Sequence, residues 1–259
     1  MSALTKMRLF SKALGMCVTV EIALPVKKDF EPDHKVPVLW LLHGAYGCHS
    51  DWLRLTSVVR YAAPYGLAIV MPSAHNSGYT DMAHGQKFYT YICEELPSVL
   101  PQMLNLSTKR EDNFIAGLSM GGAGSLMIGL SHPEQYAAIG CLSAGAINAE
   151  GNLHNSPRRL ITFGDGPIQG TYKDPLGCAQ KILDKKKLPC PRIYHACGDA
   201  DFLLPSAHKT RDFFQSLPGN PFDYQYVEDP GAHTWEFWDA HIKEYIEFLK
   251  LPKQDGVYI

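Results

Sequence analysis

The sequence predicts an α/β fold, in which helices cover both faces of a mostly parallel central sheet. Short apolar runs alternate with longer amphipathic stretches along the chain, which is the pattern of successive βαβ units. Several short runs are apolar at every position, as expected for parallel strands that are buried on both faces. The chain has 259 residues and no repeat or low-complexity linker, so we expect a single domain, 1–259.

The expected strands differ in composition, which places them in the sheet. The stretch 17–24 alternates and is therefore expected at an edge. The stretches 36–42 and 67–71 are continuously apolar, as interior strands of a parallel sheet are. The remaining strands are expected at 113–116, 137–143, 192–196 and 222–227.

Helices are expected between these strands, where apolar residues recur at helical spacing. They are 51–63, 88–104, 120–130, 205–217 and 235–249. The region 145–191 differs because it is rich in Gly and Pro. We expect it to form an excursion over the carboxyl edge of the sheet, with one short helix at about 175–185. Ligands bind at that edge in open α/β sheets, so the excursion is expected to shape the pocket.

The strongest functional signal is the segment Gly117-Leu118-Ser119-Met120-Gly121. An apolar strand leads directly into it and a helix leads directly out. This is the strand–turn–helix context in which a G-x-S-x-G motif presents a nucleophilic serine. Glycines two residues before and after the serine remove side chains that would clash in so sharp a turn. The segment therefore predicts Ser119 as the nucleophile of an α/β-hydrolase fold.

The segment 43–47, with the letters H-G-A-Y-G, directly follows an apolar strand and is the second signature of such a fold. Reaction at an acyl carbonyl places negative charge on its oxygen, and two backbone N–H groups must point at that oxygen. We expect the donors to be the N–H groups of Ala45 and Met120, with Tyr46 as the alternative to Ala45. His43 is expected to be structural, with its ring bonded to the loop backbone.

The acid and the base are expected after the last two strands, because the chain order in this fold is Ser, then Asp or Glu, then His. His233 lies on a Gly-turned loop after the final strand and is the expected base. Asp199 and Asp201 both lie in the turn after the strand at 192–196. We assign Asp201 as the residue that orients His233, and expect Asp199 to accept N–H bonds within its own turn. His233 would then take the proton of Ser119, while Asp201 fixes the histidine tautomer.

The composition argues against several other classes of function. The formal net charge of −2 offers no basic excess for a nucleic-acid partner. No apolar run could span a bilayer, and no basic amphipathic stretch suggests a membrane anchor. Lys6, Arg8 and Lys12 interrupt the first dozen residues, so no secretory signal is predicted. Seven scattered cysteines without a C-x-x-C pair predict free thiols and a cytoplasmic location.

No cofactor and no metal is expected, because a serine triad supplies the nucleophile, the base and the electrostatic stabilisation by itself. His75, Asp81 and His84 share one loop and would be the ligands if a metal were required, although their spacing matches no known ligand pattern. His132 and His241 lie at helix ends or faces and are interpreted as surface residues.

Together, these motifs resemble the esterase D group of α/β-hydrolases, and most closely its tributyrin-esterase branch of short-chain acyl esterases. The matching segments span most of the chain in the family's order: 41–44, 50–54, 78–81, 89–100, 117–122, 198–203 and 231–238. The resemblance implies hydrolysis of small acyl esters, from acetyl to butyryl and including acetyl groups on sugars. It also implies a homo-oligomer, either a dimer or a tetramer. S-formylglutathione hydrolases and the antigen 85 proteins belong to the same group.

Aromatic residues beside the motifs suggest the pocket wall. Trp52, Tyr79 and Trp235 are expected to contact the substrate, and together with Phe202 to crowd the pocket so that short acyl chains are preferred. Two other functions remain open. A thioesterase such as S-formylglutathione hydrolase would use the same triad. A non-catalytic binding protein on a hydrolase scaffold would keep the fold but would not react with a fluorophosphonate.

Overall fold

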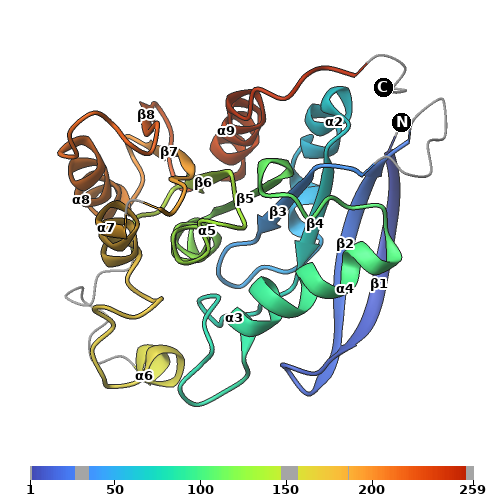
Figure 1. Ribbon diagram of the computed structural model, residues 1–259, viewed down its shortest axis with the longest axis horizontal. Helices are drawn as coiled ribbons and strands as arrows, with labels where there is room; N and C mark the ends of the chain where they lie inside the picture. Colours follow the sequence, from blue (N-terminus) through green and yellow to red (C-terminus); the bar gives the residue numbers. More distant parts are fainter. Residues whose placement is uncertain (1, 27–34, 147–156, 186, 255–259) are drawn as a thin grey trace.

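A computed structural model of the chain describes residues 2–26, 35–146, 157–185 and 187–254 (Figure 1). These residues contain an eight-stranded sheet in the order β1-β2-β4-β3-β5-β6-β7-β8. The strands are β1 (Ser2–Ser11), β2 (Met16–Pro25), β3 (Val38–Leu42), β4 (Ala68–Pro72), β5 (Asn113–Leu118), β6 (Ala138–Leu142), β7 (Arg192–Gly198) and β8 (Gln225–Asp229). Strands β3 to β8 are parallel, whereas β1 and β2 form an antiparallel hairpin that joins the sheet at β4. The predicted α/β-hydrolase fold, with its mostly parallel sheet, is confirmed.

Helices cover both faces of the sheet. They are α1 (Asp51–Leu55), α2 (Val58–Ala62), η1 (Ala63–Tyr65), α3 (Phe88–Thr90), the π-helical η2 (Tyr91–Glu95), α4 (Leu96–Met103), η3 (Arg110–Asp112), α5 (Met120–Ser131), α6 (Pro157–Phe163), α7 (Pro175–Lys185), α8 (Leu204–Gln215) and α9 (Trp235–Phe248). Helices α2 and α9 lie on one side of the sheet, and α4, α5 and α7 lie on the other (Figure 1).

The two faces of the sheet form two separate cores, because successive side chains of a strand point to opposite faces. On β3, Val38, Trp40 and Leu42 are buried against the side that carries α4 and α5. Leu39 and Leu41 are buried on the side of α2 and α9. All five side chains are therefore buried, which is why the interior strands are apolar at every position.

The N-terminal hairpin corrects one prediction. The stretch 17–24 forms β2, but β2 is not an edge strand, since it pairs with β1 on one side and β4 on the other. Strand β1 was not predicted, because its alternating residues carry charges such as Lys6 and Arg8 on an exposed face. Strand β8 starts at Gln225, so the buried Phe222 belongs to the loop before it.

Two predicted helices are interrupted. The stretch 51–63 divides at Thr56, whose backbone is extended, into α1 and α2. The stretch 88–104 contains the π-helical turn η2 and has Pro101 inside α4. The apolar spacing reports neither the extended residue nor the π-helical turn.

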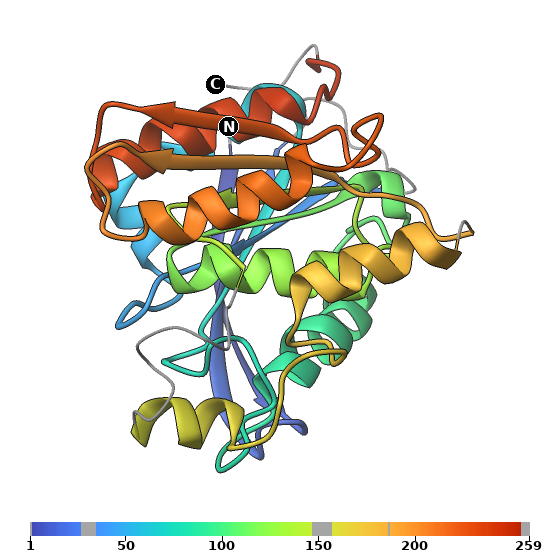
Figure 2. The same ribbon diagram turned by 90° about the vertical axis from the view of Figure 1, so that its left-hand side faces the viewer.

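The described part of the excursion at 145–191 has two helices rather than one. Its second helix, α7, has the expected bounds but packs against α5 beside the sheet, rather than over the carboxyl edge (Figure 2). The helix α6 was not predicted. Its last carbonyls accept the N–H groups of Ala83 and His84, so it is held by the loop that follows β4. Residues 147–156 lie outside the described residues.

Candidate active site

Three side chains from distant parts of the chain meet at the carboxyl edge of the sheet. Ser119 follows β5 and precedes α5, Asp201 follows β7, and His233 lies between β8 and α9. His233 Nε2 lies 2.9 Å from Ser119 Oγ. His233 Nδ1 lies 2.9 Å from Asp201 Oδ2 and 3.1 Å from Asp201 Oδ1. The structure therefore brings together the three residues expected to form the triad, in hydrogen-bonding order.

The turn that presents Ser119 is tight enough to require glycine on both sides. Ser119 has φ of 52° and ψ of −118°, a conformation that residues with a Cβ rarely adopt. A Cβ on Gly117 would lie 2.4 Å from the Gly121 carbonyl oxygen, and one on Gly121 would lie 2.5 Å from the Leu42 carbonyl oxygen. The Ser119 N–H donates to the Leu142 carbonyl at 2.8 Å, which fixes the turn against β6.

Asp201 is held as an anion by three hydrogen-bond donors. Its side chain is fully buried, and burial alone would raise its pKa. Hydrogen bonds from His233, the Leu203 N–H and the Ser143 hydroxyl outweigh burial and place the pKa of Asp201 below its ordinary value. The Trp238 indole N–H donates to Ser143 Oγ at 2.9 Å, so the serine hydroxyl proton is left to point at the carboxylate. Sequence reasoning missed Ser143 and this role of Trp238, because no motif spacing links β6 to α9.

Asp199 has a different task in the same turn. Its Oδ1 accepts the Gly231 N–H at 3.0 Å, and its own N–H donates to the Asp229 carbonyl at 3.0 Å. These bonds tie the turn after β7 to the loop that carries His233. Asp199 therefore accepts an N–H bond, as expected, but from the neighbouring loop rather than from its own turn.

The loop after β3 is supported by a buried histidine. His43 Nδ1 lies 2.7 Å from the Gly44 carbonyl, and its Nε2 accepts the Ala74 N–H at 2.9 Å. Burial lowers the pKa of His43, which keeps the ring neutral in these two bonds. His43 thus has the structural position that the sequence suggested. A Cβ on Gly44 would lie 3.6 Å from Ser119 Cβ, so this loop directly borders the nucleophile.

The N–H groups of Ala45 and Tyr46 in this loop differ in their hydrogen bonding. Tyr46 has a left-handed backbone, with φ of 64°, and its N–H donates to Asn76 Oδ1 at 2.8 Å. The Arg158 guanidinium of α6 donates to the Tyr46 hydroxyl at 3.1 Å and to Asn76 Oδ1 at 3.3 Å. Among the described residues, no acceptor binds the Ala45 N–H. Met120 begins α5, so its N–H has no acceptor within the helix.

Two of the three expected substrate contacts are corrected by burial. Trp52 is 1% exposed and donates its indole N–H to the Leu42 carbonyl at 3.0 Å. Tyr79 is 0% exposed and donates its hydroxyl proton to the His43 carbonyl at 2.8 Å. Both rings support the end of β3 from behind and have no surface for a ligand. Trp235 is half-buried, with its ring 5.5 Å from that of Trp52, and remains a candidate contact.

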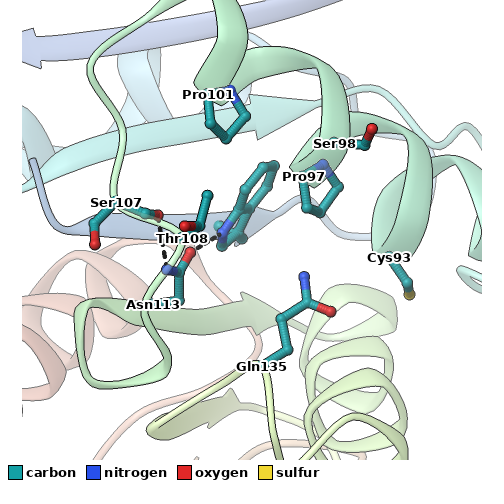
Figure 3. A pocket seen from close by; sticks show the side chains of 9 residues that line it. Cys93, Pro97, Ser98, Pro101, Ser107, Thr108, Asn113 and Gln135 are labelled. Carbon is teal, nitrogen blue, oxygen red and sulfur yellow. Dashed lines mark hydrogen bonds between the residues drawn. The ribbon is translucent and has the colours of Figure 1, made fainter. Parts of the chain in front are cut away.

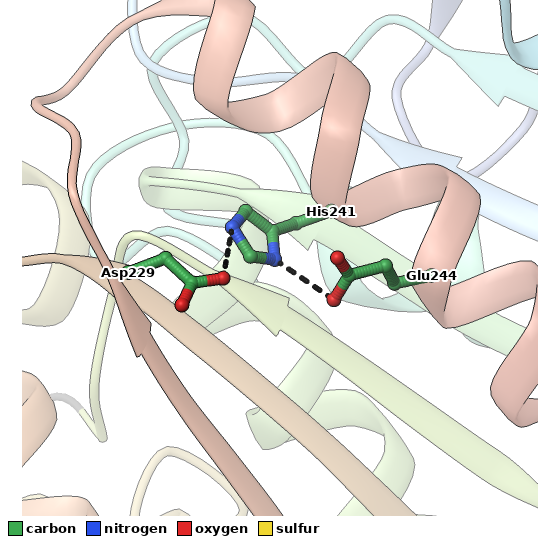
Figure 4. A group of neighbouring side chains, drawn as sticks. All are labelled: Asp229, His241 and Glu244. Atoms are coloured by element: carbon green, nitrogen blue, oxygen red, sulfur yellow. Dashed lines mark ion pairs between the residues drawn. The ribbon is translucent and has the colours of Figure 1, made fainter.

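The loop histidines do not form a metal site with Asp81. The Asp81 carboxylate accepts the N–H and the hydroxyl proton of Thr90 instead. In the described part of the chain, the one group of three potential ligands within coordination distance is Asp229, His241 and Glu244 (Figure 4). His241 is buried, which corrects its interpretation as a surface residue.

The His241 group already has internal partners. His241 Nδ1 lies 2.9 Å from the Tyr194 hydroxyl, which itself donates to Glu244 Oε2 at 2.6 Å. His241 Nε2 lies 3.7 Å from Asp229 Oδ2. The ring is thus positioned between two carboxylates, with one of its nitrogens engaged by tyrosine. Burial lowers the pKa of His241, and the tyrosine bond holds the ring in place without a metal.

A cavity of about 270 Å³ lies away from the triad, beneath α4. Pro97, Pro101 and Asn113 are among the residues that line it (Figure 3). Trp40 lines it as well. Asn113 is the first residue of β5, whereas Ser119 follows the last, so the strand's length of about 20 Å separates the cavity from the nucleophile. The Asn113 side chain bonds Trp40 Nε1 at 3.0 Å and backbone carbonyls of the adjoining loop, which gives it a structural role.

The fold and the site define a class of enzyme, the serine hydrolases built on an α/β-hydrolase fold. Residues 11–249 match the model of the family described as "Putative esterase". The chain belongs to this esterase family and is a serine carboxylic-ester hydrolase.

In the described residues, no helix combines the length and the apolar character needed to cross a bilayer.

Several relatives align with almost the whole chain. An acetyl esterase of Caldicellulosiruptor saccharolyticus is 33% identical over 267 residues, which cover 95% of this chain and 98% of that protein. The substrate-bound structure of the fluorophosphonate-binding serine hydrolase F of Staphylococcus aureus has a TM-score of 0.86 and 31% identity, with 96% and 98% coverage. An S-formylglutathione hydrolase structure from Staphylococcus aureus has a TM-score of 0.83 and 32% identity, with 96% and 99% coverage.

Proposed function

We propose that this protein hydrolyses carboxylic esters of short acyl chains, from acetyl to butyryl, through a covalent acyl-enzyme. The supporting observation is the continuous hydrogen-bonded series from Ser119 through His233 to Asp201, with Ser119 on a sharp turn at the start of a helix. In the proposed roles, Ser119 is the nucleophile, His233 is the general base and Asp201 orients the histidine.

Acylation begins when Ser119 Oγ attacks the acyl carbonyl carbon and His233 Nε2 takes the serine proton. The buried Asp201 carboxylate accepts the Nδ1–H of His233, so Nε2 is the unprotonated nitrogen that faces Ser119. The low pKa of Asp201 keeps the carboxylate ionised, and its charge stabilises the imidazolium that forms.

The negative charge on the tetrahedral intermediate would be stabilised by the N–H groups of Ala45 and Met120. Gly44 borders Ser119, and the Tyr46 N–H already donates to Asn76, so Ala45 is the donor that the loop leaves available. Met120 adds the first N–H of α5, where the helix dipole also favours negative charge. Donors fixed in this way need no reorganisation as the oxyanion forms.

The intermediate collapses when His233 gives its proton to the oxygen of the leaving group. The alcohol departs and the acyl group remains on Ser119. Water then attacks the acyl-enzyme, with His233 again acting as the base, and the acid product leaves Ser119 free. Each step uses only groups of this chain and water.

The preference for short acyl chains is supported by the similarity to an acetyl esterase and by Trp235, which is partly accessible and packs edge-on against Trp52 and Trp238. The test is kcat/KM on p-nitrophenyl esters from acetyl to dodecanoyl. We expect the highest values between acetyl and butyryl. A steady rise toward the dodecanoyl ester would contradict the preference.

The role of Ser119 is tested by Ser119→Ala and by a fluorophosphonate probe. The variant should lose activity by at least about 10⁴-fold while keeping its melting temperature, and the probe should label Ser119 alone. Ser98→Ala, which changes an exposed serine on α4, is the matched control and should keep full activity. Wild-type protein that the probe fails to label would instead favour a non-catalytic binding protein.

A thioesterase activity is the second candidate function. The similarity to an S-formylglutathione hydrolase at 32% identity and a TM-score of 0.83 favours it. The same triad would attack a thioester carbonyl, so geometry does not separate the two activities. Comparison of kcat/KM on p-nitrophenyl acetate with that on S-formylglutathione decides between them, and we expect the ester to be the better substrate.

We also propose that the protein is a homo-oligomer located in the cytoplasm. Leu4 and Phe10 on strand β1 are 61% and 63% exposed and offer apolar surface for a second copy. All seven cysteines are free thiols, which suits a reducing compartment. Light scattering after size-exclusion chromatography would report a dimer or tetramer, and cell fractionation would report the location.

A further inference from the structure

Phe202 combines high exposure with a fixed position beside the base. It is 72% exposed, yet its ring centroid lies 4.5 Å from that of His233. Its neighbours in the chain are held firmly. The Asp201 N–H donates to the Gly198 carbonyl at 3.1 Å, and the Leu203 N–H donates to Asp201 Oδ1 at 2.8 Å. The chain therefore holds an aromatic ring in solvent at one particular place, next to the imidazole.

The reaction chemistry places the leaving group near this ring. His233 must give its Nε2 proton to the leaving oxygen, so that oxygen comes within hydrogen-bond reach of Nε2. Among the residues that the structure describes, the imidazole has two aromatic neighbours. Trp238 contacts it at 4.9 Å but is buried and uses its N–H on Ser143, so it offers no room for a ligand. Phe202 is the accessible one, and the alcohol portion of the ester would therefore lie against it.

We infer that Phe202 is a specificity-determining residue that favours esters whose leaving alcohol carries a six-membered ring, either an aryl group or a pyranose, over esters of small aliphatic alcohols. This inference rests on the proposed function and deepens it. The face of an aryl ring, or the C–H face of a pyranose, can cover the exposed face of Phe202 and remove apolar surface from water, whereas a two-carbon alcohol is too small to do so. Because the backbone beside Phe202 is held by hydrogen bonds and the ring already contacts His233, substrate binding needs little further ordering of this turn.

The experiment uses three acetates that differ only in the leaving alcohol: phenyl acetate, a mono-acetylated pyranoside and 2,2,2-trifluoroethyl acetate. All three give the same acetyl-enzyme, so deacylation is common to them and kcat/KM reports acylation alone. Each rate of a variant is divided by the wild-type rate on the same ester, which cancels the intrinsic reactivity of the leaving group. The variants are Phe202→Ala and Phe202→Trp, with Met103→Ala on α4 as the matched control for removing an exposed apolar side chain.

For Phe202→Ala we expect kcat/KM to fall about tenfold on phenyl acetate and on the acetylated pyranoside, and less than about twofold on trifluoroethyl acetate. Phe202→Trp should retain the wild-type selectivity, and Met103→Ala should change none of the three rates. An equal fall on all three esters would overturn the inference, since it would mean that Phe202 only positions His233. Unchanged rates on all three would overturn it as well.

Failure of this inference is separable from failure of the proposed function. Wild-type protein that turns over none of the acetates would refute the proposed ester hydrolysis, and the inference with it. Active wild-type protein whose Phe202→Ala variant shows no selectivity change would refute the inference alone. Melting temperatures of all the variants confirm that each rate belongs to a folded enzyme.

Discussion

Exchanging each aspartate of one turn for asparagine should separate a catalytic role from a structural one. In Asp201→Asn, a neutral amide would face His233 Nδ1 in place of the carboxylate oxygens that lie 2.9 and 3.1 Å away. The amide N–H₂ would donate to Nδ1, so the ring proton would move to Nε2 and face Ser119. The imidazole could then no longer accept the serine proton.

The size of this effect follows from the contacts that are lost. Asp201→Asn removes both the correct tautomer and the charge that stabilises the imidazolium, which together are worth about 10⁴-fold in kcat in serine proteases. The asparagine oxygen can still accept the Leu203 N–H, which donates to Oδ1 at 2.8 Å, so the turn should stay folded. We expect a large loss of kcat with a small change in melting temperature.

Asp199→Asn should show the opposite balance. The amide oxygen of the asparagine can still accept the Gly231 N–H, which in the wild-type protein donates to Asp199 Oδ1 at 3.0 Å. Only the charge assistance of that bond is lost, so we expect a destabilisation of about 1 kcal/mol or less. The loop that carries His233 keeps its anchor, and kcat should fall by no more than a few-fold.

The assay is kcat on p-nitrophenyl acetate for both variants, together with their melting temperatures. The reasoning would be refuted if Asp199→Asn were inactive while Asp201→Asn turned over normally. Equal losses of kcat in both variants would also contradict it, because only one of the two carboxylates contacts His233.

Two further predictions concern metals and pH. Dialysis against EDTA should leave the ester-hydrolysis rate unchanged, and a loss that zinc or calcium restored would turn attention to Asp229, His241 and Glu244. Burial lowers the pKa of His195 to about 4, whereas the same side chain titrates near pH 6.5 in the unfolded chain. Neutral His195 therefore makes its full contribution to the free energy of unfolding above pH 6.5, and this contribution is lost as the pH falls toward 4. The loss should approach about 3 kcal/mol. In His195→Gln, the free energy of unfolding measured with urea should depend less on pH. An unchanged pH dependence in this variant would refute the assignment to His195.

Local chain signals predicted the centre of the site well. The nucleophile turn is defined within five residues, because sterics there require glycine at Gly117 and Gly121. The choice of Asp201 over Asp199 also rested on position within one turn, and the structure has Asp201 against His233. These features depend on backbone geometry over a few residues, which sequence reports directly.

Features that depend on packing between distant segments were not predictable in this way. Trp52 and Tyr79 lie beside motif residues, but whether an aromatic ring faces a pocket or a core depends on the elements that cover it. The bonds from Asn76 and Arg158 to Tyr46 join three separate segments, so no spacing indicates them. The edge strand β1 was not predicted, because Lys6 and Arg8 on its exposed face make the segment look like a polar chain end.

The left-handed backbone at Tyr46, Ser119 and Ser143 has a consequence for how this enzyme can be made more robust. Each has a positive φ, at 64°, 52° and 49°, although none is glycine, and such conformations cost on the order of 1–3 kcal/mol. All three positions adjoin the reacting groups. A glycine at any of them would relax the backbone, but it would loosen the loop after β3 at position 46, delete the nucleophilic hydroxyl at position 119, or delete the hydroxyl that bonds Asp201 at position 143. Stabilising substitutions should therefore be sought away from this edge of the sheet, since thermal tolerance and turnover are opposed there.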